Sequence, residues 1–160
     1  MVTVPPPGIG TTFKTYLPMA EQGTRPEESP TAALRSKPGE MVLLVEDELM
    51  VRRVVGRVLR DFGYAVAEAA NGREALEWLA TAPAPPHLII ADLIMPEMGG
   101  RELAAGLSGR YPDLPVLFTS GYTDNELVRR ELVQGRRPFL QKPLAPDLLL
   151  RTVRDLLDAV

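Results

Sequence analysis

The feature that most constrains the fold of this chain is an alternation of short apolar runs with longer stretches of helical periodicity. The run at residues 41–45 (MVLLV) contains no polar residue, which is typical of a strand buried on both faces of a parallel sheet. Further short runs follow at residues 64–68, 88–91, 116–119 and 139–141. Strands that alternate with helices in this way predict a five-stranded parallel sheet with helices on both faces, a doubly wound α/β fold.

The stretches between the strands begin and end with signals that are typical of helices. Apolar residues recur at helical spacing over residues 50–62, and Gly63 follows them as the expected C-cap. Asn71 stands three residues before Glu74, as in a variant of the capping box, and predicts a helix through Leu79. The other helices are expected over residues 101–110, 124–133 and 146–157, the last with Pro146 in its first turn.

Composition excludes several kinds of site and partner. The 160-residue chain has no cysteine, so it can form no disulfide framework, thiolate metal site or cysteine nucleophile. Its formal net charge of -3, without a basic stretch, argues against nucleic acid as the main partner. No apolar run approaches the roughly 20 residues that a membrane span needs, and residues 1–10 lack the features of a signal peptide. We therefore expect a soluble, cytoplasmic module.

The chain divides near residue 39. Residues 21–38 have almost no large apolar side chain and no periodicity, so they cannot bury enough surface to offset the entropy of ordering. Residues 21–39 are therefore predicted to be a flexible linker, and residues 40–160 to be the folded domain. We expect no output domain and no DNA-binding element after the last helix.

Polar residues follow the predicted strands at the edge where doubly wound sheets bind their ligands, beyond the carboxyl ends of the strands. These residues are Glu46, Asp47 and Glu48 after the first strand, Asp92 after the third, Ser120 and Gly121 after the fourth, and Lys142 and Pro143 after the fifth. Carboxylates that converge on one edge repel one another unless a cation joins them. Carboxylate oxygens with water suit Mg²⁺.

The same residues could perform phosphoryl transfer. With a metal present, the Asp92 carboxylate can attack phosphorus and form an aspartyl phosphate. The Lys142 ammonium and the Ser120 hydroxyl would then neutralise and hydrogen-bond the phosphoryl oxygens.

Four segments, VLLVEDE, LIIADLIMPEMGG, VLFTSGY and FLQKPL, resemble the receiver domain of two-component response regulators. The resemblance covers about residues 40–160, and an acidic pair, an Asp-x-x-Met-Pro loop, a hydroxyl before a small residue, and Lys-Pro each follow a different strand. It implies a flavodoxin-like sheet with the strand order 2-1-3-4-5. It also implies a module that takes a phosphoryl group from a phosphohistidine-bearing kinase or phosphotransfer domain, with Mg²⁺ as cofactor, and that switches conformation.

Carried over to this sequence, the family's motif gives each residue an expected role, with Asp92 as the phosphoacceptor. The implied metal ligands are the side chains of Glu46, Asp47 and Asp92 and the backbone carbonyl of Ile94. The implied phosphoryl-binding and switch residues are Ser120, Gly121, Lys142 and Phe139, with a cis peptide before Pro143.

Some positions depart from the family pattern or leave the assignment open. Gly99 stands where the family usually has aspartate, which puts the start of the following helix in doubt but not the phosphoryl chemistry. Glu46 replaces the commoner aspartate, and its longer arm can reach a metal through water. Thr119 lies next to Ser120, so a register shift of one residue would exchange the two hydroxyls.

The first 20 residues carry a second resemblance. Residues 8–18 (GIGTTFKTYLP) resemble the last glycine-rich turn and final strand of a histidine-kinase ATP-binding domain. The family's other nucleotide-binding boxes are absent, so this chain should not hold ATP. We expect residues 1–20 to be a terminal piece of that domain and the parent chain to be a hybrid histidine kinase. The fragment would then be no complete enzyme, although it would catalyse its own phosphorylation.

Alternative interpretations stay open at this point. Taken singly, the acidic run could be a solvated helix start, Asp92 a turn residue, Lys142 a surface charge and Phe139 a core residue. The chain could also be a hydrolase with Asp92 as nucleophile, although haloacid-dehalogenase-type enzymes would have aspartate at the position of Ile94. A degenerate receiver that acts only as a protein-interaction module is the other alternative, and the intact acceptor residues count against it. A homodimer is equally open.

Two further expectations concern the phosphoryl group. His87 follows two prolines at a strand entrance and lacks the helical setting of a phosphorylated histidine, so the donor should lie elsewhere. Ile94 and Tyr122 flank the line along which water would attack the aspartyl phosphate, while Gly121 leaves room for a donor. Because both flanking side chains are bulky, we expect a comparatively persistent phosphoryl group.

Overall fold

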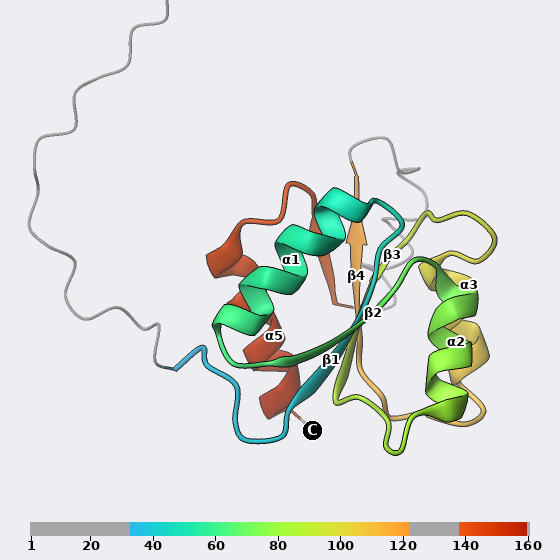
Figure 1. Cartoon of the computed structure of the whole chain (residues 1–160), viewed down its shortest axis with the longest axis horizontal. Coiled ribbons are helices and arrows are strands. Elements are labelled where there is room, and N and C mark those ends of the chain that lie inside the picture. Colours follow the sequence, from blue (N-terminus) through green and yellow to red (C-terminus); the bar gives the residue numbers. More distant parts are fainter. Residues whose placement is uncertain (1–32, 122–137, 160) are drawn as a thin grey trace, which may run out of the picture.

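The computed structural model describes residues 33–121 and 138–159 (Figure 1). Five parallel strands form one sheet in the order β2-β1-β3-β4-β5, as the resemblance implies. The strands are β1 (Met41–Val45), β2 (Ala65–Ala69), β3 (Leu88–Asp92), β4 (Val116–Ser120) and β5 (Phe139–Gln141).

Helices cover both faces of the sheet, as the alternating pattern predicts. In Figure 1, α1 (Leu49–Asp61) and α5 (Pro146–Asp158) lie on one face, and α2 (Gly72–Thr81) and α3 (Gly100–Leu107) on the other. The helix expected over residues 124–133 lies outside the described residues. Within the described part of the chain, no helix is long and apolar enough to cross a membrane.

Alternating side chains of the two central strands supply a separate core to each face. Val42 and Leu44 of β1 pack with the cluster beneath α1 and α5, whereas Leu43 and Val45 pack with the cluster beneath α2 and α3. All five residues of β3 are buried. A strand that is covered on both faces must be apolar throughout, which explains why the sequence shows continuous runs and not alternation.

The helix signals in the sequence correspond to local structure. Gly63 has φ +92°, a left-handed conformation that glycine adopts without strain, directly after α1. The Asn71 side chain accepts a hydrogen bond from the Glu74 amide at 2.9 Å. The Glu74 carboxylate in turn accepts from the Ala70 amide at 2.7 Å, one residue before the cap, so the capping box is indeed a variant. Pro146 opens α5.

Some boundaries differ from those that the sequence predicts. β2 begins at Ala65, because Tyr64 is buried against the α1 face and donates its hydroxyl to the Leu34 carbonyl at 3.1 Å. α3 ends at Leu107 and not at residue 110, because the amides beyond it donate three residues back, Ser108 to the Ala105 carbonyl at 3.4 Å and Arg110 to the Leu107 carbonyl at 3.1 Å. The strands β3 and β4 each extend by one residue to include Asp92 and Ser120.

Residues 33–40, most of which the sequence places in the linker, contact the folded domain. Leu34 packs against the α1–α5 core cluster, and the Ser36 amide donates to the Phe62 carbonyl at 3.0 Å. The Lys37 ammonium pairs with Asp158 of α5 at 2.6 Å. This stretch, residues 33–40, is called the strap below.

Candidate functional site

The carboxyl ends of four strands bring the predicted site residues together at one edge of the sheet. The β1–β3 ladder ends one residue before Glu46 and Asp92, which therefore lie side by side. The β4–β5 ladder ends at Ser120, and Lys142 follows directly after β5. Parallel pairing alone thus places residues that are far apart in the sequence within reach of one another.

Lys142 lies between the two buried carboxylates. Its Nζ is 2.5 Å from Asp92 Oδ2 and 2.7 Å from Glu46 Oε2. Its backbone amide donates to the Ser120 carbonyl at 2.8 Å, and the peptide bond to Pro143 is cis. The ammonium therefore points into the acidic cluster and not into solvent.

Burial sets the charge balance of this cluster. Glu46 is only 2% exposed, and this burial raises the pKa of its carboxyl, although Lys142 opposes the shift. Burial also disfavours the Lys142 ammonium, but the hydrogen bonds that it donates to Asp92 and Glu46 outweigh this effect and raise the pKa of Lys142. A charged lysine therefore neutralises carboxylates that would otherwise repel one another.

The three predicted acidic ligands can meet at one point. Carboxylate oxygens of Glu46, Asp47 and Asp92 lie within 4.8 Å of one another. Glu46 and Asp92 are buried, whereas Asp47 is exposed, so the cluster opens to solvent on one side. Hard oxygen donors that keep access to water are the ligands that Mg²⁺ prefers, so this donor set fits Mg²⁺.

The remaining predicted residues surround this cluster. Ser120 is 2% exposed at the end of β4. Phe139 is half-buried and packs against the small cluster of Leu93 and Phe118. The Ile94 amide lies 3.4 Å from Asp92 Oδ1, and its side chain is 60% exposed.

The two other predicted positions are Gly121 and Tyr122. Gly121 is half-buried and borders an apolar groove beside Lys142. Tyr122 lies outside the described residues.

Arg52 contacts the site, although the sequence analysis does not single it out. Its Nη1 donates to the backbone carbonyls of Glu46 and Asp47, the second at 3.3 Å. Its Nε lies 3.7 Å from Glu68 Oε2. An arginine within one helical turn of an acidic loop can in principle indicate a contact with that loop. Because the neighbouring Arg53 gives the same indication, only the fold distinguishes Arg52 from Arg53.

The start of α3 fits closely against the end of β3. A Cβ atom at Gly100 would lie 2.5 Å from the Asp92 carbonyl oxygen, and one at Gly99 would lie 2.5 Å from the Leu93 carbonyl oxygen. Gly99 is the N-cap residue and supplies no side-chain cap. A side chain at position 99 would therefore crowd the Leu93 carbonyl in this structure.

An apolar groove of about 560 Å³ lies beside the cluster, between α1 and the segment after β5. Its walls include Met50 and Val54 of α1, together with Lys142 and Leu144. Met50 is 63% exposed and Val54 is 60% exposed. Apolar side chains this exposed, next to the acidic cluster, are typical of a surface that a partner covers.

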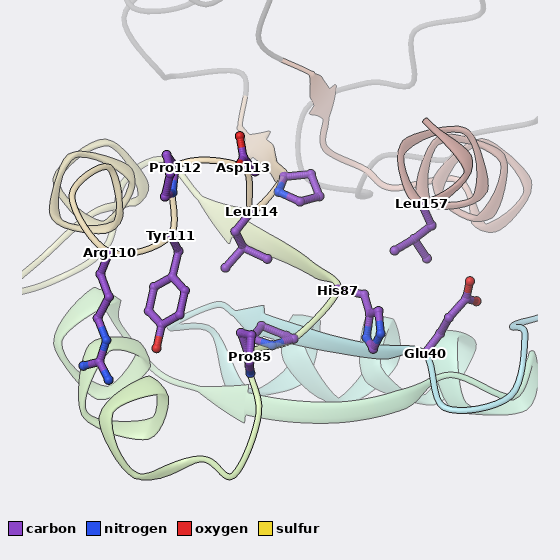
Figure 2. Close-up of a pocket in the computed structure, with 11 residues that line it drawn as sticks. Glu40, Pro85, His87, Arg110, Tyr111, Pro112, Asp113, Leu114 and Leu157 are labelled. Carbon is purple, nitrogen blue, oxygen red and sulfur yellow. The ribbon is translucent and has the colours of Figure 1, made fainter. Parts of the chain in front are cut away.

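A second cavity, of about 490 Å³, lies at the opposite end of the sheet, where the strands begin (Figure 2). Tyr111, Leu114 and several prolines line it, and none of the predicted phosphoryl-site residues does. His87 is at its border and accepts a hydrogen bond from the Met41 amide at 3.1 Å through Nδ1. This contact gives His87 a structural role at the entrance of β1.

Comparison with known proteins gives one consistent family. The family model described as "Response regulator receiver domain" matches residues 42–154. The chain is 36% identical over 159 residues to the "Sensor kinase CckA" of Brucella abortus, a match that covers 94% of this chain and 17% of that protein. It is 36% identical to the "Two-component response regulator ORR3" of Oryza sativa subsp. indica, over 69% of this chain and 86% of that protein.

A solved structure agrees with these sequence matches. The signal receiver domain of a signal transduction histidine kinase from Syntrophus aciditrophicus superposes with a TM-score of 0.67 at 33% identity. The match covers 76% of this chain and 92% of that one. The described fold is thus shared over nearly the whole of that domain.

Proposed function

The chain belongs to the family of response regulator receiver domains, and from this premise we propose that Asp92 accepts a phosphoryl group from a phosphohistidine and that the domain then switches conformation. The observation that carries the proposal is the position of the Lys142 ammonium, 2.5 Å from Asp92 within a cluster of three carboxylates. Lys142 neutralises Glu46 and Asp92, but this gives no structural reason for the lysine and all three carboxylates, Asp47 included, to meet at the ends of three different strands. They do share a purpose in holding a phosphoryl group and its metal.

The proposed step is a single displacement at phosphorus. An Asp92 carboxylate oxygen forms the new P–O bond, the P–N bond to the donor imidazole breaks, and the imidazole leaves with its electron pair. Lys142 and the Ser120 hydroxyl stabilise the charge on the phosphoryl oxygens, and the buried setting strengthens both interactions. Glu46, Asp47, Asp92 and the Ile94 carbonyl would hold Mg²⁺, which when bound supplies neutralisation of the phosphoryl charge.

The experiment is phosphorylation by acetyl phosphate with Mg²⁺, followed by intact mass. We expect one added phosphoryl group on the parent and none on Asp92→Asn, because an amide keeps the shape of the side chain but lacks the nucleophilic charge. A phosphoryl group that appears on Asp92→Asn would refute the assignment of Asp92 as the acceptor, unless mapping locates the group on a neighbouring carboxylate.

The same experiment separates the two other functions. Continued release of inorganic phosphate with many turnovers would support a hydrolase. No reaction at any Mg²⁺ concentration would support a degenerate receiver that serves only as a protein-interaction module. The aspartyl phosphate should appear once and then decay slowly.

Its lifetime is a further part of the proposal. Ile94 is largely exposed next to Asp92 and offers no hydrogen bond to orient an attacking water, and Tyr122 is proposed to flank the other side. We expect Ile94→Asn to speed the decay, since an amide can position water. Equal decay of the parent, Ile94→Asn and Tyr122→Ala would contradict this shielding.

The partner of this domain is proposed to carry the phosphohistidine, either on a kinase or on a phosphotransfer domain, and the exchange is proposed to occur in the cytoplasm. Residues 1–20 are proposed to be the end of an ATP-binding domain and residues 21–39 a linker, within a hybrid histidine kinase. Support comes from the match to the sensor kinase CckA, which covers 94% of this chain. The chain spans 17% of the length of that relative.

A further inference from the structure

We infer that Arg52 is a positioning residue that holds the acidic loop after β1 in the geometry that binds Mg²⁺. The inference rests on the proposed function, because it assigns to Arg52 a task in the metal site of that function. Arg52 carries no ligand atom itself. It acts through the backbone of the two residues that supply the carboxylates.

The contacts join one guanidinium to both acidic residues. Nη1 of Arg52 donates to the carbonyl of Glu46 and, at 3.3 Å, to the carbonyl of Asp47. Two carbonyls bound by one rigid, planar donor group cannot rotate independently. Because each peptide plane sets the direction of its own side chain, the guanidinium also restricts where the two carboxylates point.

The Glu46 end of this loop is also held by its amide, which donates to the Ala69 carbonyl at 3.1 Å, whereas Asp47 is exposed. Glu48, the N-cap residue of α1, makes no side-chain cap hydrogen bond, and no acidic residue lies in the first turn. The Glu46 side chain is anchored by Lys142. A cap would accept hydrogen bonds from the amides of the first turn, whereas Arg52 donates to carbonyls that precede the helix, so its contacts hold the loop and not the helix end.

Glu68 of β2 fixes Arg52 in turn. Its carboxylate lies 3.7 Å from Arg52 Nε and 2.5 Å from Arg60 Nη2, so it joins two arginines of α1 to the edge strand. Gly56 makes room for this contact, because a Cβ atom there would lie 3.0 Å from Glu68 Oε1. With its side chain only 15% exposed, Arg52 is held between the loop and β2.

The test measures binding of Mg²⁺ alone, by calorimetry, to the unphosphorylated chain and to matched variants. We expect Arg52→Gln to raise the Mg²⁺ dissociation constant about tenfold, the scale at which loss of a group that orients metal ligands acts. Glu68→Gln should raise it by a smaller factor. Arg57→Gln is the matched control, because Arg57 lies on the same helix, is 83% exposed and pairs with Asp61 of α1.

A second readout separates positioning from a general structural role. With acetyl phosphate as donor, Arg52→Gln should need more Mg²⁺ for half-maximal phosphorylation but should approach the parent rate at saturating Mg²⁺. Thermal unfolding in chelator shows whether each variant is folded. If Arg52→Gln does not fold, Glu68→Gln and Arg52→Lys decide the question by the same two measurements.

The failures can be told apart. Mg²⁺ binding to the parent with an unchanged dissociation constant in Arg52→Gln and Glu68→Gln would overturn the positioning role and leave the proposed function intact. A parent that neither binds Mg²⁺ nor accepts a phosphoryl group would overturn the proposed function, and the positioning role with it.

Discussion

At the scale of single residues, the site depends on one cation between buried anions. Glu46 is 2% exposed and Asp92 is 7% exposed, and two carboxylates this close together and this buried would repel strongly without Lys142. Removing one partner of a buried ion pair costs more than the pair contributes, because the other charge is left uncompensated. We therefore expect the lysine to affect stability as well as the proposed phosphoryl chemistry.

Lys142→Met tests this balance. In chelator we expect the free energy of unfolding to fall by about 2–3 kcal/mol, because Glu46 and Asp92 lose their cation. Mg²⁺ should then stabilise the variant more than it stabilises the parent. The measurement is urea unfolding with and without Mg²⁺, with Lys37→Met as control, since Lys37 is 66% exposed and its ion pair contributes little. Equal stability of Lys142→Met and the parent in chelator would contradict the argument.

At the scale of elements, the end of β3 and the start of α3 lie in direct contact. Gly100 is buried at that contact, whereas Gly106, one and a half turns further along α3, is exposed and has only the Leu76 side chain nearby, at 3.5 Å. The same substitution should therefore have opposite effects at the two ends of one short helix.

Gly100→Ala should lower the free energy of unfolding by about 2 kcal/mol, because its Cβ would clash with the Asp92 carbonyl oxygen. Gly106→Ala should raise it by about 0.5–1 kcal/mol, since alanine loses less backbone entropy in a helix. Chemical denaturation of both variants checks the signs. If both substitutions raise the free energy of unfolding, the close contact with the Asp92 carbonyl oxygen does not exclude a side chain at position 100.

The exposed apolar side of α1 leads to a second prediction at this scale. Val54→Asp should slow phosphoryl transfer from a phosphohistidine-bearing kinase by tenfold or more, because the groove beside Asp92 would no longer bury an apolar partner surface. Transfer from acetyl phosphate should not change, since a small donor needs no docking surface. An equal effect on both donors would point to damage of the site instead.

At the scale of the whole molecule, the strap ties the start of β1 to the last helix. Glu40 makes two hydrogen bonds of 2.7 Å to the guanidinium of Arg154, which is itself buried and also pairs with Asp158. Hydrogen bonding to Arg154 holds the pKa of Glu40 below its usual value, although burial opposes this shift. The first and last elements of the domain therefore share one ion-pair network.

This network predicts a pH dependence with a definite sign. A carboxyl whose pKa is lowered by folding stabilises the fold above its usual pKa, and that contribution is lost as the pH falls through the lowered value. Glu40→Gln should therefore cost about 2 kcal/mol at neutral pH, and the difference from the parent should shrink as the pH falls from about 5 to 3. Unfolding curves of both proteins across this pH range measure the difference in stability. A difference that stays constant would show that the ionisation of Glu40 does not cause it.

The sequence by itself determined most of the described elements and the edge of the sheet at which the candidate site residues meet. Short continuous apolar runs that alternate with helical patterns are typical of strands covered on both faces, and Asn71, Gly63 and Pro146 mark helix ends through local backbone chemistry. Polar residues directly after such runs must share one edge of a parallel sheet, which is why Asp92 and Lys142 could be paired in advance. All of these inferences use contacts within a few residues or the fixed direction of the strands.

Only the tertiary structure decided which side chains act at a distance. Nothing local distinguishes Arg52 from Arg53, or Glu68 from any other exposed acid, until β2 lies beside α1. The strap likewise has the composition of a linker, because its attachment depends on single contacts of Leu34, Ser36 and Lys37 with the domain and not on a periodic apolar pattern of its own. Side-chain reach across elements depends on packing angles and register, and these are properties of the assembled sheet and helices.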